Sequence, residues 1–326
     1  MTSPARPALG VGVAAAAALL FGVNGTVSKL ALEAGLTTTR LVGLRSLGAA
    51  VCLVTVTLLL RPRSLSVGRR ELGFLVVAGV VGIGMVQWLY FVAIERLPVG
   101  IALLLEYLAP VFVALWVVLV RREPVRPRIW SALALCVVGL AVVARVWSGL
   151  TRDGLGVLAG VGAGHSLAAY YLTGERGLDR RDPLSLAAWT FGAAAVFWST
   201  LEPPWSVDWV ALQEGVALPG PFDGAQVPLW SLVAWIIVLG TVVPYGFVLV
   251  AIKNLGSTRT GLLGMAEPVT SGLVAWVVLS EALTAVQLVG AAIVISGIVA
   301  AETARRGPVP ADPAPAGDVG VDGWSG

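Results

Sequence analysis

The sequence predicts an all-α integral membrane protein with ten transmembrane helices, arranged as two inverted five-helix repeats. Of its 326 residues, 57% are apolar and only 13% are charged, about half the charged share of an average soluble domain. Apolar runs of roughly 20 residues recur along the chain, which is the length that crosses about 30 Å of hydrocarbon. In addition, an apolar run with one carboxylate and one proline near its middle occurs twice, over 103–118 and 261–276.

The apolar runs define the predicted spans in order. They cover residues 8–30, 38–60, 72–94, 98–120, 129–147, 154–173, 184–201, 228–251, 260–280 and 284–302. The segment 303–326 is rich in proline, glycine and aspartate, and is expected to be a disordered tail. The loop over 202–227 is much longer than the others and holds four acidic residues without a lysine or arginine. Its Trp205 and Trp209 are expected at the level of the lipid headgroups.

The basic residues predict the orientation of the spans. Sixteen of the 22 lysines and arginines fall in segments on the same side as the N-terminus, against four on the opposite side. Because cytoplasmic loops carry the excess of basic residues, both termini are expected in the cytoplasm of a multi-pass cell-membrane protein. The net charge of +3 therefore reflects topology rather than binding of nucleic acid. Cys52 and Cys136 lie inside apolar spans, so neither a structural disulfide nor a metal site is expected, and no cofactor is predicted.

The doubled motif belongs to an internal repeat. A shift of 158 residues superimposes 93–123 on 251–281 without a gap, and a shift of 142 aligns 33–36 with 175–178. The least accidental matches are Pro110 with Pro268, Glu123 with Glu281 and Gly139 with Gly297, all under the shift of 158; the shift of 142 also pairs Gly22 with Gly164. The 16-residue difference between the two shifts is the extra length of the acidic loop. Because each copy has an odd number of helices, the second copy enters the membrane inverted, an architecture typical of transporters.

These halves, each with a proline-centred fourth helix followed by the Glu-to-Gly spacing, resemble the EamA family of the drug/metabolite transporter superfamily. The resemblance covers roughly 10–302; it is strongest over 261–300 and weaker at the basic segment RREPVRP (121–127). It implies two EamA-like repeats, 8–147 and 154–302, around a central cavity. Bacterial members are mostly exporters of amino acids and other small metabolites, which is the activity that the resemblance implies.

Ionisable side chains within the spans are the first candidates for a site. A charge at the centre of a span costs about 2.5–3.5 kcal/mol on insertion scales, so it normally faces a wet cavity or a partner. Glu106 and Glu267 lie at comparable depths, and each could bind a substrate ammonium, carry a proton, or pair with a structural cation such as Arg45. Arg45 could instead bind a substrate carboxylate. Pro110 and Pro268 predict helix kinks beside the two acids, either to line a cavity or only for packing.

Polar and aromatic residues complete the predicted substrate-binding set. They are Gln87 and Trp88 in the third span, Tyr107 in the fourth, His165 in the sixth and Tyr245 in the eighth. Trp88 and Tyr107 are favoured over Tyr170 and Tyr171, which the predicted boundaries put near a span end, where aromatic belts form. His165 could relay protons because its pKa is near physiological pH, although a lone histidine bonded to a helix carbonyl is the commoner arrangement.

Together these features predict a secondary transporter that moves a small organic metabolite by alternating access. The expected partners are the small-molecule substrate and the lipid bilayer; coupled protons, facilitated diffusion and a homodimer all fit the sequence. A transporter of nucleotide sugars or lipid-linked sugars is the alternative, but it predicts several basic groups deep in the cavity, and Arg45 is the clear one. A membrane enzyme would need clustered aspartate, histidine or cysteine, which this sequence lacks. Glycine-rich stretches such as GVVGIG (79–84) have no following GK[ST], so ATP hydrolysis by this chain is not expected.

Overall fold

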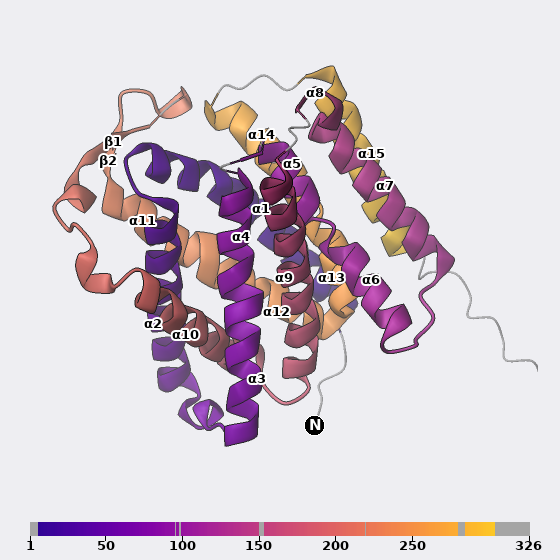
Figure 1. Cartoon of the computed structure of the whole chain (residues 1–326), viewed down its shortest axis with the longest axis horizontal. Coiled ribbons are helices and arrows are strands. Elements are labelled where there is room, and N and C mark those ends of the chain that lie inside the picture. The colour runs from indigo at the N-terminus through magenta and orange to yellow at the C-terminus, as the bar shows by residue number, and fades with distance from the viewer. Residues whose placement is uncertain are drawn as a thin grey trace, which may run out of the picture.

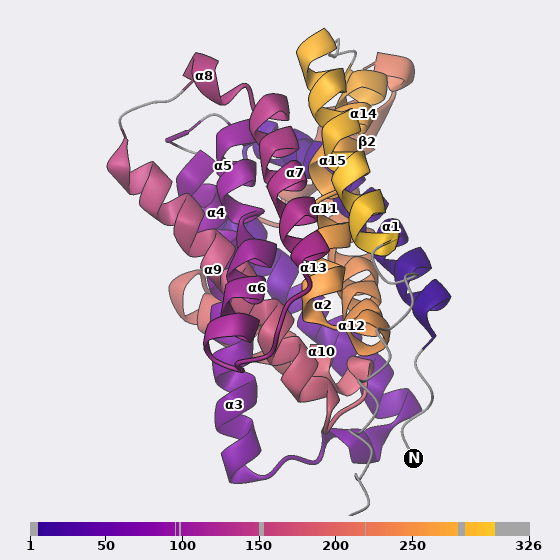
Figure 2. The ribbon, with the colours of Figure 1, turned by 90° about the vertical axis from the view of Figure 1, so that its right-hand side faces the viewer.

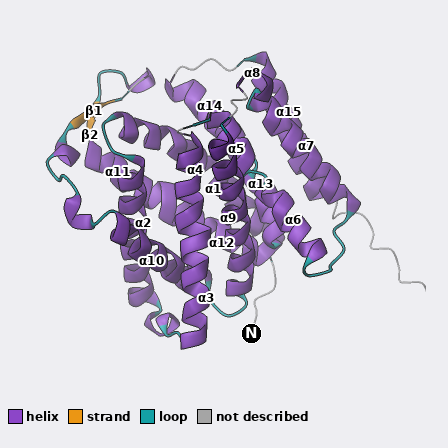
Figure 3. Cartoon of the chain, in the orientation of Figure 1, coloured by secondary structure: helices purple, strands orange, loops and turns teal. Residues whose placement is uncertain are grey.

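The computed structural model describes residues 6–94, 96–97, 99–149, 153–218, 220–279 and 284–303, and it is predominantly helical (Figure 3). The first half contains α1 (Pro7–Glu33), α2 (Thr38–Leu60), η1 (Pro62–Leu65), α3 (Arg69–Gly79), η2 (Val80–Met85), α4 (Val86–Ile94), α5 (Val99–Glu106), α6 (Ala109–Leu119), α7 (Pro127–Val143) and α8 (Val146–Gly149). The second half contains α9 (Gly154–Leu178), α10 (Pro183–Leu201), η3 (Pro204–Ser206), η4 (Ala211–Gln213), β1 (Gly215–Ala217), η5 (Gly220–Phe222), β2 (Gln226–Pro228), α11 (Leu229–Ile237), η6 (Val238–Val242), α12 (Val243–Leu255), α13 (Ser257–Gly264), α14 (Glu267–Leu279) and α15 (Ala285–Thr303).

A helix, or a run of consecutive helices, lies over each predicted apolar span. Within the described ranges, seven helical runs are long and apolar enough to cross a membrane, and Pro127–Val143 and Ala285–Ala301 are apolar but shorter. The predicted span 260–280 falls on α13 and α14, which are separated by a break. The chain is therefore a multi-pass helical membrane protein. The predicted tail lies outside the described residues beyond Thr303.

Two of the helical runs contain a π-helical turn at equivalent places. η2 begins at Val80 and η6 begins at Val238, which is the same spacing of 158 residues that aligned the repeat motif. A π turn inserts one residue into the α-helical hydrogen-bond ladder and is frequently found at functional sites. In η6 the Thr241 hydroxyl donates to the carbonyl of Ile236, 2.7 Å away. The structure therefore extends the internal correspondence upstream of residue 93.

The helix breaks beside the two acids also repeat at this spacing. α5 and α6 are separated at Tyr107, and α13 and α14 are separated at Met265. Pro110 is the second residue of α6 and Pro268 is the second residue of α14. A proline at the start of a helix has no intrahelical hydrogen bond to lose. Each break is thus located just before one of the prolines, where a new helix can begin at little cost.

Helices α7 and α15 pack side by side along most of their length (Figures 1 and 2). The contact is reciprocal: the position that a Cβ would occupy at Gly139 lies 2.7 Å from the Val294 nitrogen, and at Gly297 it lies 2.6 Å from the Cys136 sulfur. Cys136 and Val294 are themselves 158 residues apart, and the Cys136 thiol donates to the Val294 carbonyl at 3.6 Å. Small residues let these helices approach closely, as in other membrane helix pairs.

The long acidic loop folds onto one end of the helical bundle. Its β1 and β2 form a two-stranded antiparallel hairpin, with Val216 opposite Val227. Val207 and Leu212 are buried among apolar residues of α1, α2 and α11, which anchors the loop. Trp205 and Trp209 are 82% and 62% exposed, so their indoles are available to the headgroup region expected for them.

The connection between the halves leads into α9 through a capped start. The carboxylate of Asp153 accepts the Gly156 amide at 3.0 Å and the Arg96 guanidinium at 3.2 Å. The Gly156 amide, assisted by Arg96, holds the pKa of Asp153 below its ordinary value. The cap satisfies a helix-end donor that would otherwise have no partner.

Candidate functional site

A cavity of about 500 Å³ lies inside the helical bundle, between helices of both halves of the chain. Its walls come from α1, α2, α4 and α5, and from α9, α12, α13 and α14. The polar and charged residues that line it are Asn24, Thr26, Ser28, Lys29, Glu33, Arg45, Gln87, Glu106, Thr260, Glu267 and Ser271. A cavity of this size accommodates a small organic molecule.

The two predicted acids lie at the walls of this one cavity. Glu106 is the last residue of α5 and Glu267 is the first residue of α14, so both are placed by the repeated helix breaks. The hydroxyl of Tyr107, which lies in the first break, donates a hydrogen bond to Oε2 of Glu267. The contact links the two halves of the chain across the cavity and orients the Glu267 carboxylate.

Arg45 lines the same cavity from α2 and is held by the π-helical turn η6. Its side chain donates from Nε to the Thr241 hydroxyl at 2.8 Å and from Nη2 to the Gly240 carbonyl at 3.4 Å. Among the residues that the structure describes, no carboxylate lies within 4 Å of the Arg45 guanidinium. A guanidinium has five N–H donors, so several remain for a ligand. The structure therefore differs from the alternative in which Arg45 forms an ion pair with Glu106 or Glu267.

Aromatic side chains form one wall around Tyr245 of α12. Its ring packs edge-on against Phe21 at 5.1 Å, Tyr170 at 5.5 Å and Phe191 at 5.1 Å between centroids. Tyr170 and Tyr171, expected at a span end, are both only 5% exposed and line the cavity. The expectation was wrong because α9 continues to Leu178, beyond the predicted boundary, and so places these rings deeper in the bundle.

Two predicted contacts lie elsewhere, which corrects their proposed role as cavity residues. Trp88 is 39% exposed and does not line the cavity, because the cavity face of α4 carries Gln87 and Tyr90. One residue along a helix turns the side chain by about 100°. His165 is exposed on α9; it stacks on Phe112 with centroids 3.9 Å apart, and its Nδ1 lies 2.9 Å from the Val161 carbonyl. A histidine bonded to a helix carbonyl is the commoner of the two alternatives considered.

Two polar residues of the cavity wall were not among the predicted site residues. Asn24 and Ser28 are one helical turn apart on α1 and line the cavity. Asn24 Oδ1 and Ser28 Oγ, like Gln87 Oε1, are buried and have no hydrogen-bond partner within the described part of the chain. Buried polar atoms are normally paired. These three atoms have almost no exposed surface, so their side chains would have to rotate before they could bond to a molecule in the cavity. The signal was the four-residue spacing of small polar residues within an otherwise apolar span.

Exposed residues of α1 show where the cavity opens. Gly25, Lys29 and Glu33 are spaced by four residues along α1, and all three are exposed at the cavity wall. Ala14 and Ala17, toward the other end of α1, also line the cavity but are only 4% and 2% exposed. The mouth therefore lies near the C-terminal end of α1.

A family model described as the EamA-like transporter family matches the chain twice, over residues 8–145 and 154–302. The chain belongs to the EamA-like transporter family. The members of this family are membrane transporters and not enzymes, and the match agrees with the resemblance found in the repeat motif. The two matches share the chain almost equally, and both contribute walls to the cavity of this EamA-like protein.

Curated relatives of the EamA-like chain include named exporters. The threonine/homoserine exporter RhtA of Salmonella typhimurium strain SL1344 is 31% identical over 69% of this chain and 70% of its own length. The threonine/homoserine exporter RhtA of Escherichia coli strain K12 is 30% identical over 66% of each chain. The inner membrane transporter YicL of Salmonella typhimurium, which is uncharacterized, is 22% identical over 87% of this chain and 91% of its own.

The fold is also found among solved structures. A protein of known crystal structure superimposes with a TM-score of 0.72 and covers 92% of this chain and 99% of its own, at 18% sequence identity. At this identity the likeness concerns the fold alone. It supports the helical arrangement that surrounds the cavity of the EamA-like chain.

Proposed function

We propose that this protein is a secondary transporter that exports a small zwitterionic metabolite, an amino acid or a close relative, across the cell membrane. The observation that carries the proposal is one cavity with Glu106 and Glu267 together with an Arg45 that has spare donors. The carboxylates would bind the ammonium group and Arg45 the carboxylate, by charge-assisted hydrogen bonds. The relatives named as threonine/homoserine exporters support this class of substrate.

The unpaired polar atoms near the cavity indicate which substrate side chain the site would prefer. Asn24, Ser28 and Gln87 line the cavity, and their buried, unpaired oxygens would meet a polar substrate group such as a hydroxyl after a rotation of these side chains. A site that hydrogen-bonds a hydroxyl discriminates against a substrate without one, since its own polar atoms would stay unpaired. A hydroxylated amino acid therefore fits the cavity better than an aliphatic one of the same size.

The alternative substrate, a nucleotide sugar or lipid-linked sugar, is favoured less by the charges. Arg45 and Lys29 are the cations at the described cavity wall, and they are outnumbered by the acids Glu33, Glu106 and Glu267. A diphosphate would need an excess of basic groups in the low-dielectric interior. The cavity is better suited to a molecule that carries both charges.

Transport would proceed by alternating access between two inverted five-helix repeats, with ten membrane crossings and both termini in the cytoplasm. The equivalent spacing of the π turns, of the helix breaks and of the α7–α15 contact supports this architecture. In that orientation the mouth at Lys29 and Glu33 faces outward, and the arginine-rich end of the bundle is closed. Exchange with protons and assembly into a homodimer remain compatible with this arrangement.

The closed end has a specific latch on α9. The carboxylate of Glu175 accepts the amide and the hydroxyl of Ser257 at 3.2 and 3.1 Å, and pairs with Arg121 at 2.8 Å. Glu175 lies one helical turn beyond Tyr171, and Tyr171 lines the cavity. Its contacts therefore join the two halves of the chain at the arginine-rich end of the cavity. Its counterpart under the 142-residue shift is Glu33, which is exposed at the open mouth. We infer that the two glutamates close opposite ends in alternation.

Replacing Glu175 by glutamine is expected to open the arginine-rich end. The change weakens three contacts, and a loss of about 1.4 kcal/mol shifts a two-state equilibrium tenfold. A cysteine placed at Ala17 in the cavity should then react about tenfold faster with an impermeant maleimide in inside-out vesicles. The chain without this reporter gives the background of the native cysteines.

The matched control for this change is Asp179→Asn, which removes a charge near the same end of α9 from an exposed carboxylate. It should leave the labelling rate at the wild-type value. Equal rates for Glu175→Gln and wild type would remove the latch from the proposed mechanism.

The substrate class can be tested by transport in proteoliposomes. Preloaded threonine or homoserine is expected to drive uptake of the labelled amino acid, with and without an imposed pH gradient. A gradient that accelerates the flux would indicate proton exchange; an unchanged flux would indicate facilitated diffusion. Flux of a nucleotide sugar, with none for any amino acid in a hydroxylated and aliphatic panel, would favour the alternative substrate instead.

A further inference from the structure

A second cavity, of about 290 Å³, lies away from the transport cavity at the arginine-rich end of the bundle. It is lined by residues of α3, of the last turn of α9 and of the turn that follows α9. These are Arg70, Glu71, Phe74, Leu75, Arg176, Gly177, Arg180 and Arg181. Four cations and one carboxylate thus surround a space next to an apolar floor.

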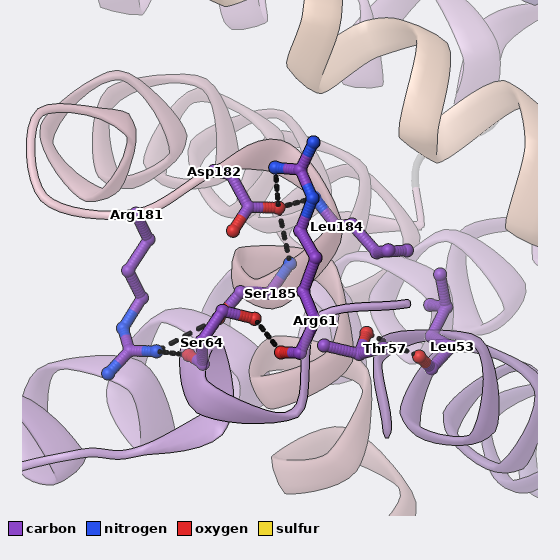
Figure 4. Close-up of polar contacts among 8 residues, drawn as sticks. All are labelled: Leu53, Thr57, Arg61, Ser64, Arg181, Asp182, Leu184 and Ser185. Atoms are coloured by element: carbon purple, nitrogen blue, oxygen red, sulfur yellow. Dashed lines mark hydrogen bonds and ion pairs between the residues drawn. The ribbon is translucent and has the colours of Figure 1, made fainter. Parts of the chain in front are cut away.

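The Glu71 carboxylate and Arg181 neutralise one another and form the rigid back of this second cavity. Arg181 Nε donates to Glu71 Oε1 at 2.6 Å, and its terminal nitrogens donate to the carbonyls of Ser64 and Ser66 at 2.7 and 2.8 Å. Its side chain is only 6% exposed. Figure 4 shows the Arg181 contact with Ser64 and the neighbouring ion pair of Arg61 with Asp182. The network fixes the start of α3 against the start of α10.

The remaining three arginines form an unbalanced rim. Arg70, Arg176 and Arg180 are exposed, and none of them is within 4 Å of a carboxylate among the described residues. Converging guanidinium groups bind phosphate oxygens with paired N–H donors. The chemistry of the rim therefore fits a phosphate group.

The surroundings of the rim indicate that this phosphate belongs to a lipid. Phe74 and Leu75 line the inner side of the second cavity. Val77 and Val81 follow Arg70 and Phe74 at helical spacing on the same side of this helical run, and they are 59% and 37% exposed. The run is apolar enough to span the bilayer. Acyl chains could lie along this apolar surface while the headgroup meets the arginines at the membrane interface. A soluble phosphate would use the rim but not the apolar surface.

We propose that this second cavity binds the headgroup of an anionic phospholipid such as phosphatidylglycerol. Basic pockets between transmembrane helices are suited to such headgroups. The bound lipid would add an anchor to α3, which forms the outer edge of the bundle beside α9 and α10 (Figure 2). This site is separate from the proposed transport site and does not depend on its substrate.

The test is native mass spectrometry of delipidated protein titrated with phosphatidylglycerol or phosphatidylcholine. Wild type should bind one phosphatidylglycerol at least tenfold more tightly than phosphatidylcholine. The triple variant Arg70→Gln/Arg176→Gln/Arg180→Gln should lose this preference. The matched control, Arg63→Gln/Arg122→Gln/Arg128→Gln, removes three exposed arginines outside the second cavity and should keep it.

Three results would overturn the proposal. The first is an equal loss of the phosphatidylglycerol preference in both triple variants, which would mean that general surface charge causes it. The second is displacement of the lipid by millimolar inorganic phosphate, which would mean that the site binds soluble anions. The third is the absence of a preference for phosphatidylglycerol in wild type. If the triple variant without lipid has a lower melting temperature than wild type, the single variant Arg176→Glu is used in its place. This single change reverses one exposed rim charge and should still weaken phosphatidylglycerol binding at least tenfold, and unchanged binding would contradict the site.

Discussion

Replacing Glu267 by glutamine is expected to reduce amino-acid export by about 10- to 100-fold. The change keeps the shape of the side chain and removes the charge that would bind the substrate ammonium. Hydrogen bonds to charged groups contribute about 1.5–3 kcal/mol, which corresponds to that range of rates or affinities. The measurement is counterflow of labelled threonine in proteoliposomes, together with ligand-induced thermal stabilisation of the purified protein.

Two further variants separate binding from folding. Tyr107→Phe removes only the hydroxyl that donates to Glu267, so a smaller loss of about tenfold is expected. Glu214→Gln removes a carboxylate from the exposed loop and should leave counterflow unchanged. Wild-type counterflow and wild-type stabilisation by threonine in Glu267→Gln would show that this acid is not part of the site.

Alanine at Gly139 or Gly297 is expected to lower the stability of the protein by forcing α7 and α15 apart. A Cβ at Gly139 would lie 2.7 Å from the Val294 nitrogen and 2.9 Å from the Gly290 carbonyl, and at Gly297 it would lie 2.6 Å from the Cys136 sulfur and 3.0 Å from the Ala132 carbonyl. Backbone atoms cannot rotate away, so α7 and α15 would have to separate. Overpacking of this kind costs about 1–3 kcal/mol. Thermal unfolding in detergent should therefore begin about 5 °C lower.

Two other helical glycines serve as controls, because alanine at these positions is expected to have the opposite effect on stability. Gly192 in α10 and Gly246 in α12 have open space where a Cβ would be placed, since no atom of a neighbouring described residue lies within 4 Å of that position. Alanine there should be neutral or stabilising by up to about 1 kcal/mol, because alanine restricts the unfolded chain and favours the helix. If Gly139→Ala and Gly297→Ala matched these controls, the close contact of α7 with α15 would not contribute to stability.

Much of the fold could be predicted from the sequence because its causes are local or periodic. Apolar runs long enough to cross a membrane leave few alternatives to helices, since backbone polar groups must be paired within the segment. The shift of 158 residues relates corresponding residues from the sequence alone, and Cys136 and Val294, which it relates, are in contact. Glu106, Glu267 and Arg45 were identifiable because a charge inside an apolar span is rare.

Other features depended on contacts that no local pattern contains. Trp88 and Gln87 are neighbours in sequence, yet only Gln87 lines the cavity, because the packing of α4 decides which face turns inward. Tyr170 and Tyr171 were misplaced since a helix boundary in an apolar sequence cannot be read to within a turn. Likewise, nothing in the sequence indicated that Arg45 would bond to Thr241 in a π turn of the other half.

Composition and repetition along this chain were enough to specify a duplicated, multi-pass helical transporter, because the bilayer imposes one backbone solution on every long apolar segment. Which faces of those helices meet, which polar atoms stay unpaired, and which end of the cavity is open were decided only by tertiary packing. Those properties arise from pairs of residues as distant as Tyr107 and Glu267, or Arg121 and Glu175, whose proximity is set by all the helices together.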